Sequence, residues 1–315
     1  MRNRVTTILT ILALSIPIFA QKVTFMPQWT PQSQFAGYYV ALEKGFYTEE
    51  GLDVEIKHLS VNSTETATDY LLRDEVQITG MQLIQAMIAR SNNTPLVNIF
   101  QLTQRTGLMC VSHTPIFAPS DLTNMKVGRW KAGYSDICEI INTQIDSKIN
   151  WVPFINGINL FIYKAVDATL CYSYSEYIQL LQALGRIDQK NVIRYYDFGY
   201  TIPEDGLYVT EQYYSRNKQT IDKFVRATKR GWDYTRENID EALEITKSYT
   251  DAANIITNDN FQRLMLEEYL RLQVNPRTNK PDYSPIDEHE FNKMIDDIFE
   301  SGHIVKKINY KDVIK

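Results

Sequence analysis

Apolar and polar residues alternate in short runs that are separated by segments with helical spacing. Val23 to Met26 is an apolar run, and Leu52 to His58 alternates in the manner of a strand. Between them, four apolar residues recur at helical spacing before Gly45, where a helix would end. These four are Phe35, Tyr38, Tyr39 and Leu42. The order of strand, helix and strand predicts the opening of a parallel sheet.

The same kind of pattern continues to about residue 102 and then restarts after Asp121. The first series continues through Thr66 to Arg73, Val76 to Thr79, Ile84 to Arg90 and Leu96 to Leu102. The second series predicts strands over Lys126 to Arg129, Asn150 to Phe154 and Ala168 to Tyr172, and helices over Asp136 to Gln144 and Tyr177 to Leu184. Gly185 stands where the last of these helices would end. The restart indicates a second α/β lobe.

The C-terminal third is predicted to be helical and to cover the first lobe. One face of the segment from Thr220 to Glu237 is apolar, and Ala242 to Tyr249 and Phe261 to Gln273 continue with helical spacing. We expect no sheet in this part. The segment from Asn275 to Pro285 is rich in Pro, Asn and charge, which is typical of a surface loop.

The first twenty residues have the layout of a secretory signal peptide. Arg2 and Arg4 precede an apolar stretch from Val5 to Phe19, and the small residue Ala20 is followed by a polar Gln21. The apolar stretch is shorter than the roughly 20 residues that span a membrane, although a retained anchor is the alternative. We expect cleavage after residue 20 and a periplasmic location.

Composition argues against a nucleic-acid partner and is that of an ordinary globular chain. The chain has 33 Lys and Arg against 38 Asp and Glu, a formal net charge of −5, and no basic run. Twenty tyrosines and four tryptophans offer flat apolar faces with polar tips, which suit planar ligands, although most are expected in the core. We expect a small-molecule ligand.

Neither the cysteines nor the histidines have the spacing of a metal site. The three cysteines are expected to be buried free thiols; they are Cys110, Cys138 and Cys171. The four histidines are expected at the surface or hydrogen-bonded in the core; they are His58, His113, His289 and His303. No Gly-x-Ser-x-Gly motif is present. The sequence therefore predicts no metal, no cofactor and no catalysis.

The segment from Trp29 to Ile56 resembles the opening of the hydroxymethylpyrimidine-synthase-like (NMT1/THI5-like) group of type II periplasmic solute-binding proteins of ABC transporters. It reads WTPQSQFAGYYVALEKGFYTEEGLDVEI. The resemblance extends over almost the whole chain after residue 20. The other matching segments are Asp121 to Gly128, Val166 to Tyr177, Tyr196 to Val209 and Gly231 to Tyr234. The pattern is most similar to that of formylaminopyrimidine binders.

The resemblance implies the type II periplasmic-binding-protein fold, in which two α/β lobes close over a ligand cleft. We expect residues 21–105 and 200–315 to form the first lobe and residues 106–199 the second. The crossings are expected near Thr103 to Val111 and Tyr196 to Pro203, where Gly107 and Gly199 can absorb backbone rotation. The implied protein is a monomer that binds a planar nitrogen heterocycle, such as a thiamine pyrimidine precursor, and delivers it to an ABC permease.

The resemblance also implies three ligand-binding residues. Trp29 falls where an aromatic stacks on the ring, and Tyr172 and Glu176 fall where the second lobe meets it. Trp29 follows the first strand, and the carboxyl ends of parallel strands are where such sheets bind ligands; the alternative is that it fills the space between the lobes. Glu176 begins a predicted helix, where an acid also stabilises the helix dipole. Ser175 stands where the family commonly has Asn, which leaves the hydrogen-bond pattern open.

Three further residues at the start of the first predicted helix are candidates. Gln32 and Ser33 place polar groups where an anion or carbonyl could dock, with simple helix capping as the alternative. Gly37 lies in no phosphate-loop motif, so it marks either tight packing of the helix or close approach of a ligand.

Two alternative functions remain open at this point. A secreted protein of the same fold could present its ligand to a membrane sensor instead of a permease. The fungal members of the family are pyrimidine-synthase enzymes that use pyridoxal phosphate and a histidine of their own chain. They carry a cysteine-rich run and are cytosolic, whereas the cysteines here are scattered and an export signal is predicted.

Overall fold

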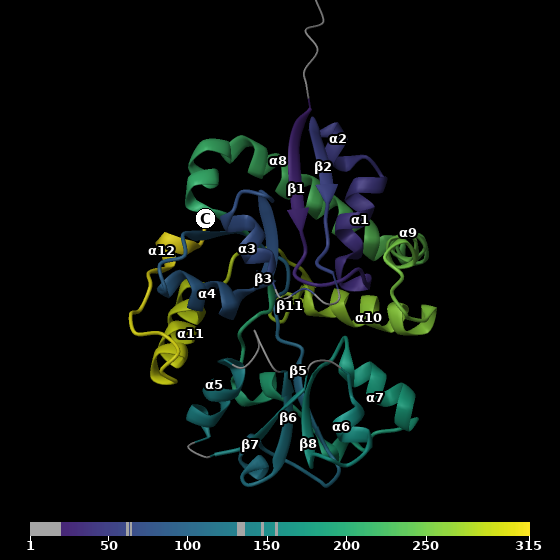
Figure 1. The fold of residues 1–315 in the computed structure, drawn as a ribbon, viewed down its shortest axis with the longest axis vertical. Helices are drawn as coiled ribbons and strands as arrows, with labels where there is room; N and C mark the ends of the chain where they lie inside the picture. Colours follow the sequence, from purple (N-terminus) through teal and green to yellow (C-terminus); the bar gives the residue numbers. More distant parts are fainter. Residues whose placement is uncertain (1–19, 61–62, 64, 131–135, 146–147, 155–156) are drawn as a thin grey trace, which may run out of the picture.

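The structure, a computed structural model, describes residues 20–60, 63, 65–130, 136–145, 148–154 and 157–315. The predicted signal peptide lies outside the described residues, apart from Ala20. In the described part of the chain, no helix is both long and apolar enough to cross a membrane. Two lobes, each built on a five-stranded sheet, lie one above the other (Figure 1).

The upper lobe contains a mixed sheet with the strand order β2-β1-β3-β10-β4. β1 pairs in parallel with both β2 and β3, as the strand, helix, strand pattern predicted, whereas β10 runs antiparallel to β3 and β4. The strands are β1 (Gln21–Met26), β2 (Leu52–Ile56), β3 (Ile78–Gln82), β4 (Leu96–Gln101) and β10 (Asp205–Thr210). Helices α1 (Ala36–Glu43), α2 (Phe46–Glu49), α3 (Ala67–Leu72) and α4 (Leu83–Ser91) connect the first four.

The lower lobe repeats this arrangement with the strand order β7-β6-β8-β5-β9. β6 is parallel to β7 and β8, and β5 is antiparallel to β8 and β9. The strands are β5 (Leu108–Ser112), β6 (Lys126–Trp130), β7 (Asn150–Phe154), β8 (Ala168–Tyr172) and β9 (Val192–Arg194), and the helices are α5 (Asp136–Gln144), α6 (Asn159–Ile162) and α7 (Glu176–Leu184). The expectation of two α/β lobes is confirmed.

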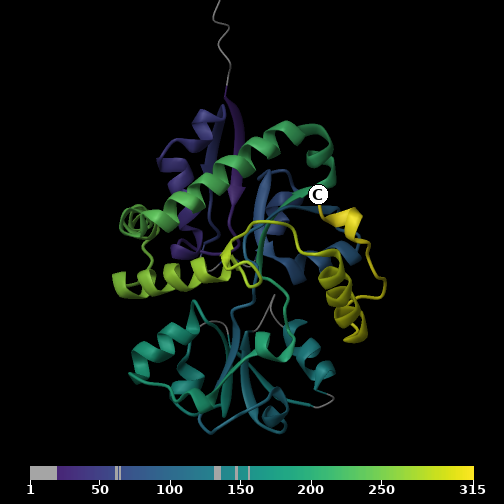
Figure 2. The same cartoon turned by 180° about the vertical axis from the view of Figure 1, so that it is seen from behind.

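The C-terminal helices mostly cover the upper lobe. α8 (Glu211–Glu237) lies across the back of that lobe and packs on α1, as Figure 2 shows. α9 (Ile239–Ala252) and α10 (Asp259–Leu272) follow, then α11 (Glu288–Glu300) and α12 (Tyr310–Val313). α11 also packs against α5 of the lower lobe, and α10 against α7. These helices therefore reach both lobes.

The expectation that this part contains no sheet was wrong in one place. β11 (Val274–Asn275) and β12 (Lys280–Pro281) form a small antiparallel hairpin that overlaps the segment predicted to be a loop. Each strand has two residues, so no alternation of apolar and polar positions can reveal it.

Gly37 has a packing role between α1 and α8. A Cβ atom at Gly37 would stand 2.2 Å from Cδ2 of Trp232, and one at Gly231 would stand 2.1 Å from the Gly37 carbonyl oxygen. The two helices can approach this closely only because both positions lack a side chain. Tight helix packing, one of the two explanations offered for Gly37, is therefore present in the structure. A ligand-binding role of Gly37 stays a prediction.

Two chain segments cross between the sheets, and the first is shorter than predicted. Residues 102–107 connect β4 to β5, and residues 195–204 connect β9 to β10. The predicted crossing over Thr103 to Val111 was wrong after Gly107, because residues 108–111 belong to β5. The division at 105/106 and 199/200 falls within these segments and stays a prediction. Gly199 has φ +85°, a conformation that favours glycine, whereas a Cβ on Gly107 would stand 2.8 Å from Ser173 Oγ.

The three cysteines are buried free thiols, as expected. Burial raises the pKa of Cys110 and of Cys171 well above the ordinary value of a thiol. Because the thiolate is the reactive form, these side chains act as small apolar core residues.

Candidate functional site

A pocket lies where the two lobes and both crossing segments meet. Its polar wall contains Gln82 at the carboxyl end of β3, Tyr172 at the carboxyl end of β8, and Thr106 and Glu204 from the two crossings. Ile84, Ile137 and Ile202 are among its apolar residues. Carboxyl ends of strands and the seam between two lobes are common places for ligand sites. The open space is about 10 Å³, room for about one water molecule.

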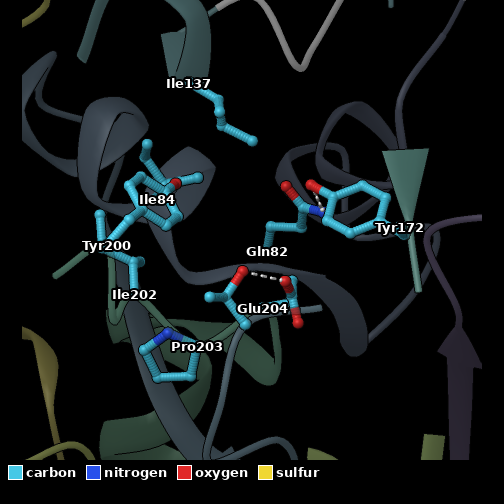
Figure 3. A pocket seen from close by; sticks show the side chains of 9 residues that line it. Gln82, Ile84, Ile137, Tyr172, Tyr200, Ile202, Pro203 and Glu204 are labelled. Carbon is cyan, nitrogen blue, oxygen red and sulfur yellow. Dashed lines mark hydrogen bonds between the residues drawn. The ribbon is translucent and has the colours of Figure 1, made fainter. Parts of the chain in front are cut away.

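Gln82 and Tyr172 close this pocket by bonding to each other across the lobes. Gln82 Nε2 donates to the Tyr172 hydroxyl at 2.8 Å, and both side chains are buried. Figure 3 shows them facing each other above Glu204. Two side chains that are 90 positions apart in the sequence therefore occupy the space between the lobes.

Glu204 directly precedes β10 and has an unusual set of partners. Its Oε1 accepts hydrogen bonds from Thr106 Oγ1 at 2.6 Å and from the Gly107 backbone N–H at 2.7 Å. Its Oε2 is buried and has no hydrogen-bond partner among the residues that the structure describes. Burial raises the pKa of this carboxyl to about 8, and nearby Asp205 adds to the shift against the lowering effect of Thr106 and the Gly107 N–H.

Asp205 lies beside Glu204 and, like it, is held through one carboxyl oxygen. Its Oδ2 accepts from Gln34 Nε2 at 2.6 Å and from the Tyr269 hydroxyl at 2.5 Å, and Gln28 also hydrogen-bonds to the carboxyl. Its Oδ1 is buried and has no hydrogen-bond partner among the described residues. Burial raises the pKa of Asp205, and these three partners oppose the shift. Gln34, Tyr269 and Gln28 come from η1 (Ser33–Phe35), α10 and the loop after β1. Asp205 therefore ties together the parts of the upper lobe that border the cleft.

Glu176 begins α7 and is bonded within the lower lobe. Its Oε1 accepts from the Trp130 indole N–H at 3.0 Å, and its Oε2 accepts from the Tyr172 backbone N–H at 3.1 Å. Burial raises its pKa, and these hydrogen bonds partly oppose the shift. The predicted pair of Tyr172 and Glu176 is brought together, with Tyr172 lining the pocket and Glu176 supporting its backbone.

Aromatic side chains of the lower lobe stack on one another toward the upper lobe. The Tyr172 ring lies between Trp130, at a centroid distance of 4.9 Å, and Tyr174, at 5.3 Å. Tyr174 then meets Tyr269 of α10 edge to face at 5.2 Å. The stack fixes the plane of the Tyr172 ring and extends to Tyr269, where the two lobes are in contact.

Trp29 lies in the loop after β1 and does not line the pocket. Its side chain is 43% exposed, which excludes the alternative that it fills the space between the lobes. Its backbone carbonyl accepts from His58 Nδ1 at 2.7 Å, while His58 Nε2 accepts from the Tyr39 hydroxyl at 2.8 Å. Burial lowers the pKa of His58 to about 4, so the neutral ring serves as this bridge. His58 is a hydrogen-bonded interior residue, as expected.

Gln32 and Ser33 are occupied by neighbouring side chains. Gln32 makes no capping hydrogen bond; its Nε2 donates to Gln34 Oε1 at 2.6 Å instead. The Ser33 backbone N–H and hydroxyl both donate to Gln262 Oε1 at 2.7 Å. The alternative that these two residues simply cap the helix was wrong. The Ser33 N–H is bonded to Gln262 in this arrangement and is not available to an anion. The ligand-binding roles of Trp29, Tyr172, Glu176, Gln32 and Ser33 stay predictions.

The described residues contain no group of three or more His, Cys, Asp or Glu that could hold a metal ion. The described part of the pocket wall also contains no Lys, Arg or His. Its polar groups can orient a ligand by hydrogen bonds, and its aromatic and aliphatic walls can cover a flat apolar face.

Sequence reasoning missed Gln82 and Glu204, two polar residues of the pocket wall. A signal for Glu204 was present, because the acids Glu204 and Asp205 stand between Ile202-Pro203 and the apolar run Leu207–Val209. Acids flanked on both sides by core residues are rarely solvated, and a buried acid is retained for a partner. No comparable signal marks Gln82.

Named relatives of similar length include binding proteins and synthases. The chain is 25% identical over 267 residues to the riboflavin-binding protein RibY of Chloroflexus aurantiacus, covering 82% of this chain and 74% of the relative. It is 25% identical over 277 residues to the formylaminopyrimidine-binding protein of Halalkalibacterium halodurans, covering 81% and 79%. It is also similar to the 4-amino-5-hydroxymethyl-2-methylpyrimidine phosphate synthase of Aspergillus parasiticus, at 25% identity over 68% of this chain and 66% of that one.

The fold matches that of periplasmic binding proteins. The periplasmic aliphatic sulphonate binding protein SsuA of Escherichia coli superposes with a TM-score of 0.69 at 13% identity, covering 94% of this chain and 92% of that one. At this identity the likeness concerns the fold alone. The family described as NMT1/THI5 like matches residues 32–242, two thirds of the chain. The chain therefore belongs to the NMT1/THI5-like family.

Proposed function

We propose that this chain is an extracytoplasmic solute-binding protein of an ABC importer that takes a small planar nitrogen heterocycle into the cleft between its lobes. The observation that carries the proposal is the pocket at the carboxyl ends of β3 and β8, bordered by both crossing segments. Every element of this wall belongs to one lobe or to a connection between them, so relative motion of the lobes would open and close the site.

The chemistry of the pocket suits a flat ring with polar edges. The stacked Tyr172 ring and the isoleucines Ile84 and Ile137 provide apolar surfaces, while Gln82, the Tyr172 hydroxyl and Glu204 provide hydrogen-bonding groups. Formylaminopyrimidine and riboflavin, for which two relatives are named, are both planar nitrogen heterocycles. A planar ring can meet both kinds of surface at once.

The present arrangement is a closed one that a ligand would have to enter. A space of about 10 Å³ is far below the ~300 Å³ or more of ordinary ligand pockets. Separation of the lobes would break the bond between Gln82 and Tyr172, and a ligand would replace it with bonds from both residues. A ligand favours the closed form only by the difference between its affinities for the closed and the open forms. That difference comes from contacts with both lobes that the ligand can make only in the closed form.

The pocket lends no support to the synthase activity of other members of the family. The resemblance implies that those enzymes use a histidine of their own chain together with pyridoxal phosphate. None of the described residues that line the pocket is His or Lys, and His58 is bonded to Trp29 and Tyr39 instead. We therefore assign the chain a binding function and no catalysis.

Calorimetric titration tests the proposal. The purified protein is titrated with 4-amino-5-hydroxymethyl-2-methylpyrimidine, thiamine and riboflavin, and with an aliphatic sulfonate and an amino acid as controls. We expect saturable binding of at least one heterocycle and none of the controls. Failure with all three heterocycles, together with clear binding of the sulfonate or the amino acid, would contradict the proposal.

A further inference from the structure

We propose that Glu204 is a ligand-binding residue of the cleft and that it selects a ligand carrying an N–H donor, either an amine or an amidine. The inference rests on the proposed function and names the recognising group on the upper lobe. The resemblance pointed to a carboxylate on the lower lobe only, Glu176.

The position of the Glu204 carboxyl is fixed from several directions. The Glu204 backbone carbonyl accepts from the Leu83 N–H at 2.7 Å, which anchors the residue to the start of α4. Thr106 and Gly107 both donate to the same carboxyl oxygen, Oε1. Rotation of the carboxyl to give Oε2 a donor would therefore take both donors away from Oε1.

Oε2 is left as a buried acceptor in the wall of the pocket. The residue is 4% exposed, and within the described part of the chain Oε2 has no hydrogen-bond partner. A buried polar atom without a hydrogen bond destabilises a folded protein, so its presence in a pocket needs a reason. A ligand N–H at this position would supply the missing bond.

The charges around the pocket favour a donor and disfavour an anion. Asp205 is adjacent on β10, and the hydroxyls of Tyr174 and Tyr269 lie near Glu204. Tyr172 and Tyr200 line the same pocket. The described pocket wall contains no cationic side chain that could neutralise two carboxyls. Because burial raises the pKa of Glu204 to about 8, the ligand-free carboxyl holds a proton near neutral pH. An amine or an amidine at Oε2 would stabilise the ionised carboxyl and displace this proton to solvent, whereas a sulfonate, carboxylate or phosphate would oppose its ionisation.

A pair of ligands and a pair of variants test this inference. The ligands are 4-amino-5-hydroxymethyl-2-methylpyrimidine and its analogue with a methyl group in place of the amine. The variants are Glu204→Gln and, as a matched control, Glu300→Gln at the exposed end of α11. We expect the wild-type protein and the control to prefer the amine by about tenfold to hundredfold, and Glu204→Gln to lose most of that preference. Glu204→Met, similar in length and without a polar atom, serves if the glutamine variant does not fold.

The outcomes separate this inference from the proposed function. An unchanged preference for the amine in a folded Glu204 variant would overturn the inference and leave heterocycle binding intact. The protein could instead bind an aliphatic amine such as spermidine, and no heterocycle, with weaker binding in Glu204→Gln. That result would support the inference and contradict the proposal that the ligand is a heterocycle. Binding of neither 4-amino-5-hydroxymethyl-2-methylpyrimidine nor spermidine would overturn the inference alone. Binding of methanesulfonate that becomes tighter in Glu204→Gln, without binding of any heterocycle, would overturn the proposed ligand class as well.

Discussion

The two lobes bring carboxyl groups to the cleft in different states. Glu176 of the lower lobe has a donor on each oxygen, Trp130 on one and the Tyr172 backbone on the other. Among the described residues, Glu204 of the upper lobe has two donors on Oε1 and none on Oε2. In the lower lobe, the carboxyl of Glu176 is fully hydrogen-bonded and supports the aromatic rings. In the upper lobe, Oε2 of Glu204 is left for a hydrogen bond to a ligand. A carboxyl near the cleft is therefore not always available to a ligand: Glu176 is bonded within its lobe, whereas Glu204 has an oxygen to offer.

The largest expected effect is on the pH dependence of stability. Burial raises the pKa of Glu204 to about 8, whereas the unfolded chain releases this proton near pH ~4.3. Between these values the folded protein binds a proton that the unfolded chain does not, so stability falls as pH rises. The slope from this group is at most about 1.4 kcal/mol for each pH unit.

Urea unfolding at about pH 5 and about pH 8 measures this slope. We expect Glu204→Gln to flatten the decline but not to remove it, because burial also raises the pKa of Asp205 and Glu176. If the free energy of unfolding depends on pH in the same way in the variant and in the wild-type protein, Glu204 is ionised in the folded state. Its pKa would then not be raised, and this difference between the lobes would not exist.

The next effect is the cost of replacing each carboxyl by an amide. In Glu176→Gln the new NH₂ group must face either the Trp130 indole N–H or the Tyr172 N–H, which leaves a buried donor without an acceptor. We expect a loss of about 1–3 kcal/mol in the free energy of unfolding. In Glu204→Gln the amide oxygen keeps both donors, and we expect a change below about 1 kcal/mol near pH 5. Equal losses of unfolding free energy in the two variants, measured by thermal or urea unfolding, would contradict the difference between Glu176 and Glu204.

A smaller effect is expected at Trp29. Because the side chain is 43% exposed, Trp29→Phe should alter the free energy of unfolding by no more than about 0.5 kcal/mol. If the indole stacks on the ligand, the variant keeps a stacking face and loses at most about tenfold in affinity. Glu176→Gln should weaken binding more, because it disturbs the support of Tyr172. Calorimetry on both variants decides this, and negligible effects from both would place the ligand elsewhere.

The smallest signal is expected from the overall shape. We predict that the lobes separate about residues 102–107 and 195–204 without ligand and close with it. Small-angle scattering should then show a lower radius of gyration at saturation. An unchanged radius would indicate a rigid, already closed protein, and Gln82 and Tyr172 would remain bonded to each other in solution.

Much of the fold could be predicted because its elements repeat at the spacing of strands and helices. β5 (Leu108–Ser112) was missed because it follows directly on a crossing; burial alone does not explain the miss, because β4 and β8 are equally buried and were predicted. The hairpin of β11 and β12 was missed because two-residue strands have no period. Local pattern thus misses very short strands and a strand that continues directly from a crossing.

Less of the site could be predicted, because it forms between distant segments. Tyr172 was placed in the cleft by the resemblance, and in the structure it lines the pocket. Gln82 meets it only through the packing of one lobe on the other. The carboxyl orientation of Glu204 depends on Thr106 and Gly107, which lie about a hundred positions earlier. No pattern along the chain encodes these contacts.

A crystal structure of the protein grown with saturating 4-amino-5-hydroxymethyl-2-methylpyrimidine tests the central claim most directly. We predict density for one ligand between the lobes, with its ring beside Tyr172, its amine within hydrogen-bond distance of Glu204 Oε2, and the direct bond between Gln82 and Tyr172 replaced by bonds to the ligand. An empty cleft with the Gln82–Tyr172 bond intact, or a ligand bound outside the cleft, would contradict the account.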